Sequence, residues 1–109
     1  TGTALNDVSE TQAFKNALGE DAYKAHISSI KGSIGHMLGA AGAAEAVATV
    51  MALKEGIVPP TINLDELDPE CDLNYTPNHP VKADLTIAMS DSLGFGGHNS
   101  CVVFRKYLG

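Results

Sequence analysis

KGSIGHMLGAAGAAEAVATVMALKEG, residues 31–56, dictates how the rest of this chain must fold. After His36 the segment predicts a long helix that runs through Leu53 and stops at Gly56, with small or apolar residues on nearly every face. A helix without a polar face is buried all round, so it needs packing partners on more than one side. Glu45 divides the apolar run into pieces too short for a bilayer core, which argues against a membrane span.

The segments around this helix predict a second helix and several short strands. Residues 6–18 carry an apolar stripe, and Asp7 with Glu10 fits a capping box at the helix start. Alternating or continuous apolar runs predict strands at residues 25–30, 73–75, 85–90 and 101–104. The last run is apolar throughout, which indicates burial on both faces. This order is typical of an α/β fold, yet the chain supplies no second layer for the far side of its buried helix.

The composition describes one globular domain at most, because the chain has 109 residues, of which 44% are apolar and 18% charged. A formal charge of −6 argues against a nucleic-acid partner, since binding to phosphates needs clustered lysine and arginine. The basic residues are scattered along the sequence, which also argues against a polybasic membrane tether. They are Lys15, Lys24, Lys31, Lys54, Lys82, Arg105 and Lys106. The chain opens at Thr1 with no methionine and no apolar leader, so we expect a truncated chain without a signal peptide.

Cysteine and histidine spacing argues against a metal centre and a disulfide framework. Cys71 and Cys101 are far apart and form no CxxC pair, and their number is compatible with a reducing cytoplasm. No two of the four histidines are three or four residues apart, so no metal site is predicted. Neither cysteine has a base placed by the sequence to activate it, so these residues offer no nucleophile.

The glycine-rich segment GFGGHN, residues 94–99, lies between two predicted strands. It does not match a dinucleotide-binding loop, which opens a helix, and no P-loop sequence is present either. Its glycines favour a tight hairpin because they permit positive φ. The alternative is a functional turn that points backbone N–H groups at a ligand oxygen.

Lys31, His36 and Glu45 are the candidate chemical groups at the start of the long helix. Taken singly, Lys31 can be an ordinary lysine at a strand end, and His36 can be a histidine satisfied by a carbonyl. A helix N-terminus is electropositive, however, so a histidine there stays neutral and can donate a hydrogen bond to a carbonyl. Glu45 is costly to bury unpaired, and Lys31 is its obvious partner. Because Glu45 is half a turn out of phase with His36, it serves either structure or chemistry.

Six segments, taken in order, carry a family resemblance. Thr1-Gly2-Thr3 is similar to the end of a T-H-G-T-x-T motif, and the stretch from Lys31 to Glu45 is similar to K-S-x-x-G-H-x-x-G-A-A-G-x-x-E. The remaining matches are Leu5-Asn6-Asp7 with Glu10, Pro59-Pro60-Thr61-Ile62-Asn63-Leu64, Cys71-Asp72-Leu73, and Ser92-Leu93-Gly94-Phe95-Gly96-Gly97. Together they resemble the C-terminal part of a β-ketoacyl-[acyl-carrier-protein] synthase, most closely the type II enzyme of bacterial fatty acid synthesis.

The resemblance implies an α/β fold, namely the C-terminal portion of a thiolase-like αβαβα fold with a mixed sheet and a buried central helix. Residues 1–109 are then a single partial domain, the C-terminal half of a synthase whose N-terminal half is absent. That half would carry the nucleophilic cysteine, and the first catalytic histidine would lie two positions before Thr1. The isolated fragment is therefore expected to be inactive.

The resemblance also implies roles for individual residues. His36 would be one of two catalytic histidines that bind the malonyl thioester carbonyl and promote decarboxylation. Lys31 would support that histidine, with Glu45 as its acidic partner. The hydroxyls of Thr1 and Thr3 would bond the phosphopantetheine arm. Phe95 would be a gate whose N–H contributes to the oxyanion hole, with room to move provided by Gly94, Gly96 and Gly97.

The activity implied is a decarboxylative Claisen condensation of malonyl-acyl-carrier protein with an acyl-enzyme thioester in fatty acid elongation. The expected partner is the acyl carrier protein, whose phosphopantetheine carries the substrates, and no further cofactor or metal is expected. The full-length protein is expected to be a cytoplasmic homodimer. Two alternatives remain, a non-catalytic subunit resembling a chain-length factor and a polyketide ketosynthase domain. Asp91 stands where the family usually has Asn, which puts any cation site there in doubt.

Overall fold

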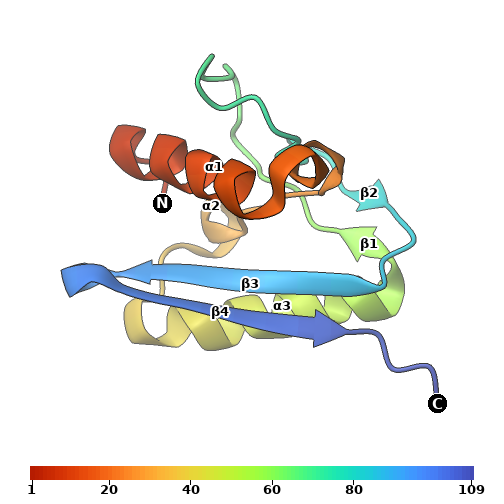
Figure 1. Ribbon diagram of the computed structural model, residues 1–109. Coiled ribbons are helices and arrows are strands. Elements are labelled where there is room, and N and C mark those ends of the chain that lie inside the picture. Colours follow the sequence, from red (N-terminus) through yellow and green to blue (C-terminus); the bar gives the residue numbers. More distant parts are fainter.

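A computed structural model describes all residues, 1–109, and has the α/β composition that the sequence predicts (Figure 1). None of its helices combines the length and the apolar character that crossing a bilayer requires. The elements in chain order are α1 (Ala4–Leu18), a 3₁₀ helix (Gly19–Lys24), α2 (Lys31–Ile34), a 3₁₀ turn (Leu38–Ala40), α3 (Ala41–Glu55), β1 (Ile57–Val58), β2 (Val81–Lys82), β3 (Ile87–Gly94), a 3₁₀ turn (Phe95–Gly97) and β4 (His98–Arg105).

The long antiparallel hairpin of β3 and β4 is the central sheet element. Its register pairs Ile87 with Arg105 at one end and Gly94 with His98 at the other. The predicted hairpin at the glycine segment is confirmed, because the turn places Gly96 and Gly97 at φ of 78° and 80°, values that favour glycine. The two strands β1 and β2 form a separate two-residue antiparallel pair.

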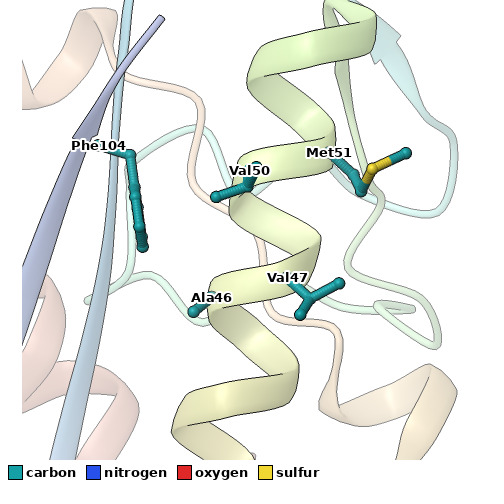
Figure 2. A pocket seen from close by; sticks show the side chains of 5 residues that line it. All are labelled: Ala46, Val47, Val50, Met51 and Phe104. Atoms are coloured by element: carbon teal, nitrogen blue, oxygen red, sulfur yellow. The ribbon is translucent and has the colours of Figure 1, made fainter.

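The helices α1 and α3 lie on opposite faces of the hairpin (Figure 1). Phe104 of β4 points at Ala46 and Val50 of α3 (Figure 2), and its cross-strand partner is Ala88. Asp91, three residues after Ala88, projects from the other face because side chains alternate along a strand. That carboxyl contacts Glu10 of α1. Side chains on one face of the hairpin therefore point toward α3, and those on the other face point toward α1.

The helix α3 is covered on one side only in this chain. Val50 and Ala46 point toward the hairpin, whereas Val47 and Met51 point away from it (Figure 2). Val47 is 65% exposed, and only the two ends of the helix, at Ala41 and Leu53, are buried. An apolar helix with one bare face needs a second layer. The 109 residues do not provide that layer, as the sequence predicts.

The capping box predicted at Asp7 and Glu10 is wrong. The helix α1 begins earlier, at Ala4, and its N-cap is Thr3, which is extended and makes no side-chain capping bond. The backbone N–H of Asp7 already donates to the carbonyl of Thr3 inside the helix, so it needs no side-chain partner. Glu10 accepts a hydrogen bond from the Asn6 side chain instead.

All four predicted strands differ from the structure, either in extent or in burial. Residues 25–30 and 73–75 form no strand. Single hydrogen bonds join the two segments, such as that from the Ile27 N–H to the Asn74 carbonyl. Residues 85–90 contribute to β3, which starts two residues later than predicted and runs to Gly94. The segment 101–104 is a strand but is not buried on both faces, and Val103 is 62% exposed. A strand is buried on both faces only where layers cover both. Here α3 packs on one face, α1 covers little of the other, and no further strand lies at either edge of the hairpin.

A small buried cluster joins α1 to the loop that follows β1. Thr11 exchanges a 2.7 Å hydrogen bond with the Tyr75 hydroxyl, and Cys71 and Leu73 are buried beside it. Lys15 forms an ion pair with Asp72. This hydrogen-bonded pair holds the pKa of Asp72 below its usual value and the pKa of Lys15 above its own. The loop is thereby fixed against α1.

Candidate active site

Lys31 and Glu45 form the ion pair that the sequence predicts. Lys31 opens α2 and Glu45 lies in the second turn of α3, and their charged groups are in direct contact. The side chains are only 25% and 15% exposed, so the pair is screened less than a surface ion pair. Pairing removes most of the cost of placing Glu45 in an apolar helix. The ion pair therefore fixes α2 to α3.

His36 lies in the connection between α2 and the 3₁₀ turn, and its side chain is exposed. The sequence places it at the start of the long helix, but the α-helical part begins only at Ala41, after the 3₁₀ turn. Its Nδ1 accepts a 3.0 Å hydrogen bond from the backbone N–H of Leu38. An imidazole nitrogen that accepts carries no proton, so a neutral ring has its proton on Nε2. His36 thus presents an N–H donor on the side away from Leu38.

Leu38 is the residue that sequence reasoning missed. Its φ of 51° is in the left-handed region, which is unfavourable for a non-glycine residue. This conformation lets its N–H turn back to the ring two residues earlier. Gly35, at φ 78°, ends α2 just before the histidine and makes the same reversal possible on the other side. No residue type in the sequence signals a backbone donor at Leu38.

The hairpin tip carries Phe95, whose side chain is 93% exposed. Gly94 is required there, because a Cβ at that position would lie 2.9 Å from the carbonyl oxygen of His98. Gly96 lies next to the His98 ring, and Gly97 has open space around it. The tip is therefore a tight backbone turn with one large apolar side chain projecting from it.

Thr1 and Thr3 are exposed and joined by a 3.0 Å hydrogen bond between their hydroxyls. Nearby, the carboxyl of Glu10 lies close to that of Asp91. Burial, followed by the hydrogen bond and charge of Asp91, raises the pKa of Glu10 to about 7. This carboxyl pair lies outside the predicted site set, since neither residue signals a partner more than eighty positions away.

The predicted site segments gather at one end of the molecule. Figure 1 shows the N-terminus, α2, the start of α3 and the hairpin tip toward the same end, on the left of the view. Among the site residues, Lys31 pairs with Glu45, and Thr1 bonds Thr3. His36 and Phe95 make no hydrogen bond or ion pair with these groups or with each other. The end of the molecule therefore holds an exposed imidazole donor, a half-buried ion pair, a glycine turn and two exposed hydroxyls.

Residues 1–65 match the family described as beta-ketoacyl synthase, C-terminal domain. The chain is 54% identical over 107 residues to 3-oxoacyl-[acyl-carrier-protein] synthase 2 of Synechocystis sp., a match that covers 98% of this chain and 26% of the relative. The chain thus spans about a quarter of the length of the curated relatives that it matches.

Solved structures have the same fold. The type II polyketide complex AntDE:AntF, an acyl-carrier protein in complex with its ketosynthase bound to the hexaketide, superposes with a TM-score of 0.93 at 42% identity, covering 96% of this chain and 26% of that one. The ishigamide ketosynthase/chain length factor gives a TM-score of 0.92 at 37% identity, with 98% of this chain and 26% of that one covered. The expected thiolase-like α/β fold is confirmed by these neighbours. Sequence family and fold agree along the chain, which belongs to the β-ketoacyl synthase C-terminal domain family.

Proposed function

We propose that this chain supplies the carbonyl-binding part of the active site of a 3-oxoacyl-[acyl-carrier-protein] synthase. In the proposed reaction, malonyl-acyl-carrier protein loses CO2, and the resulting enolate carbon attacks an acyl thioester on a cysteine. The cysteine thiolate leaves, and the product is a 3-oxoacyl thioester on the carrier. The observation that carries this proposal is the Leu38 N–H on Nδ1 of His36, since it leaves Nε2–H as the free donor.

The proposed role of His36 is to hold the malonyl thioester oxygen while negative charge develops on it. A fixed N–H donor stabilises an enolate oxygen more than it stabilises the neutral carbonyl, so it lowers the barrier to decarboxylation. A neutral ring is suited to this role because it gives up no proton and needs no reorganisation. Leu38 supports the role by holding the ring in one tautomer.

The ion pair of Lys31 and Glu45 is proposed to position this histidine. Lys31 precedes His36 by five residues, and its contact with Glu45 anchors the short α2 from which the histidine loop leaves. Glu45 thus serves structure first, and the chemistry only through Lys31.

The hairpin tip and the N-terminal threonines are proposed to contact the acyl group and its carrier arm. Phe95 projects freely, so it can act as a gate, and its backbone N–H can contribute to an oxyanion hole for the acyl thioester. Gly94, Gly96 and Gly97 allow the tip to change conformation without side-chain clashes. The hydroxyls of Thr1 and Thr3 can bond a phosphopantetheine amide. The AntDE:AntF complex supports an acyl carrier protein as the partner.

We further propose that a longer polypeptide completes the site. The bare face of α3 and the exposed hairpin need a covering layer, and relatives are about four times as long as this chain. That remainder would carry the nucleophilic cysteine and the first histidine, and the complete enzyme would be a homodimer. We expect this enzyme to be cytoplasmic, and two distant cysteines without a CxxC pair are compatible with that expectation. The 109 residues alone are expected to be inactive.

A second candidate function is a non-catalytic subunit resembling a chain-length factor, which the ketosynthase/chain length factor neighbour favours. The other alternative is a polyketide ketosynthase domain, which similarity to the AntDE:AntF complex favours. The presence of Lys31, Glu45 and His36 in this chain supports a catalytic synthase over a non-catalytic subunit.

The experiment that separates these functions uses the full-length polypeptide that carries this sequence. It is incubated with acyl-acyl-carrier protein, and the intact protein mass is then measured. A catalytic synthase gains one acyl group on a cysteine and, after malonyl-acyl-carrier protein is added, releases 3-oxoacyl-acyl-carrier protein. A chain that gains no acyl group and forms no condensation product, although it is folded, contradicts the proposed function and favours the non-catalytic subunit.

A further inference from the structure

Residues 59–64 carry one of the motifs singled out in the sequence, yet the proposed chemistry gives them no role. The two prolines that open this segment have no backbone N–H, so they cannot donate to a regular ladder. Hydroxyl groups take part in the bonds to the neighbouring chain instead. The Ser28 hydroxyl donates to the Pro59 carbonyl, and the Ser29 N–H donates to Oγ1 of Thr61 at 3.0 Å. The segment is thereby joined to the residues that lead into α2.

Thr61 is held in place by the loop that follows it in the sequence. Its N–H donates to the Thr76 carbonyl, and its own carbonyl accepts from the Asn78 N–H, both at 2.9 Å. Because both backbone groups of this half-buried residue are bonded, the position of its hydroxyl is fixed as well. Thr61 therefore presents a preset acceptor to the Ser29 N–H.

The bond to Ser29 bears on α2, which starts directly after it. Ile30 is the N-cap of α2, and its carbonyl accepts two of the first N–H groups of the helix. The side of α2 packs on Ile62 of the same segment. A Cβ at Gly32 would lie 3.0 Å from Cγ1 of Ile62 and 3.2 Å from its carbonyl oxygen. The segment therefore holds α2 both at its entrance and along its side.

A helix of four residues cannot maintain its own conformation, so α2 depends on such outside contacts. Lys31 opens the helix and is anchored to Glu45, and Gly35 ends it immediately before His36. The ion pair fixes α2 to α3, whereas the hydroxyl of Thr61 fixes the entrance of α2 to the segment 59–64. These two anchors set the point from which the histidine loop leaves.

We infer that Thr61 is a positioning residue for His36, which it orients through the bond from Ser29 and through α2. This inference rests on the proposed function, because it takes His36 as the group that holds the malonyl thioester oxygen. Acyl transfer to the cysteine relies on the hairpin tip in the proposed function. Thr61 should therefore affect the decarboxylation step and leave acyl transfer unchanged.

The test measures two rates in the full-length polypeptide that carries this sequence, acylation by acyl-acyl-carrier protein and CO2 release from malonyl-acyl-carrier protein. Thr61→Val has nearly the same shape but no acceptor for Ser29. It should lower kcat for CO2 release by about threefold to tenfold, while KM and the acylation rate stay within about twofold. Thr61→Ser keeps the hydroxyl, so it should restore most of the lost rate.

Thr11→Val is the matched control, because Thr11 is a buried threonine of α1 whose hydroxyl bonds Tyr75 and not the entrance of α2. It should leave the ratio of the two rates unchanged even where thermal melting shows lower stability. Parental CO2 release by folded Thr61→Val, an equal fall in both of its rates, or a Thr61→Ser protein as slow as Thr61→Val would overturn the inference. A parent polypeptide that releases no CO2 would instead overturn the proposed function, and the inference with it.

Discussion

Leu38 orients the imidazole of His36, since its backbone N–H donates to Nδ1 at 3.0 Å from a left-handed conformation at φ 51°. The donor comes from the main chain, so no side-chain substitution at Leu38 removes it directly. The arrangement commits the ring to one tautomer before any substrate arrives, which is the preorganisation that carbonyl catalysis requires.

The neutral imidazole of His36 should exist as a single tautomer. At pH values where His36 is neutral, its proton should reside on Nε2, and long-range ¹H–¹⁵N correlation spectra of the imidazole report this directly. Leu38→Gly keeps the N–H and suits positive φ better, so the same tautomer should persist in that variant. A neutral His36 protonated on Nδ1 would contradict the hydrogen bond and the role proposed for the ring.

The ion pair of Lys31 and Glu45 should show strong energetic coupling. Removing one partner leaves a partly buried charge, so Lys31→Met and Glu45→Gln should each lower the free energy of unfolding by about 1–3 kcal/mol. The double variant should lose less than the sum of the two, because it leaves no unpaired charge. Chemical denaturation of the four proteins measures the coupling, and strictly additive losses would show that the two groups do not interact.

Glu10 should make stability fall as pH rises. Its pKa is about 7 in the folded chain and near 4.5 when unfolded, so between these values the folded state binds more protons. Stabilisation is then full below pH 4.5 and is lost as pH rises through 7, by about 1–2 kcal/mol after allowing for solvent screening. Glu10→Gln should remove this slope.

Denaturation of both proteins from pH 5 to pH 8 provides the measurement. The Glu10→Gln variant should match the parent at pH 5 and exceed it in the free energy of unfolding at pH 8. Asp91→Asn is the second probe, because it removes the charge that opposes ionisation of Glu10 and should flatten the slope in part. Parallel pH curves for the parent and Glu10→Gln would rule out the raised pKa.

Asp72 should act in the opposite direction. Its pKa is lowered by Lys15, so its stabilisation is present above the unfolded value of 3.8 and is lost as pH falls through the lower folded pKa. Asp72→Asn should therefore lower Tm at pH 7, and by less at acidic pH, where more of the carboxyl is protonated in the folded chain. Asp21→Asn breaks the exposed pair with Lys24 and serves as the control, with little change in Tm at either pH. Equal effects of the two substitutions at pH 7 would contradict the special role of Asp72.

The sequence predicted the elements that its periodicity and glycines encode. The apolar run before Gly56 gave α3, and the glycine segment after Leu93 gave the hairpin turn. Strand 25–30 failed because β-branched residues favour extended backbone, but a ladder also needs a neighbouring strand. The N-cap at Thr3 was missed because it makes no side-chain capping bond. The acidic residues Asp7 and Glu10 instead suggested a capping box that does not form.

The same contrast holds for the candidate sites. The partner of Glu45 could be predicted because a buried carboxylate restricts the choice to few cations, and Lys31 was the correct one. The bond from Leu38 to His36 depends on backbone dihedrals that no residue type encodes.

The most direct test of the proposed chemistry is CO2 release from malonyl-acyl-carrier protein by the full-length polypeptide that carries this sequence. His36→Ala removes the Nε2–H donor and should lower the rate by roughly 10²–10³-fold. His36→Gln can place an amide N–H near the same position, so it should retain more of the rate than His36→Ala does. Unchanged CO2 release by a folded His36→Ala protein would contradict the proposal that this imidazole holds the thioester oxygen.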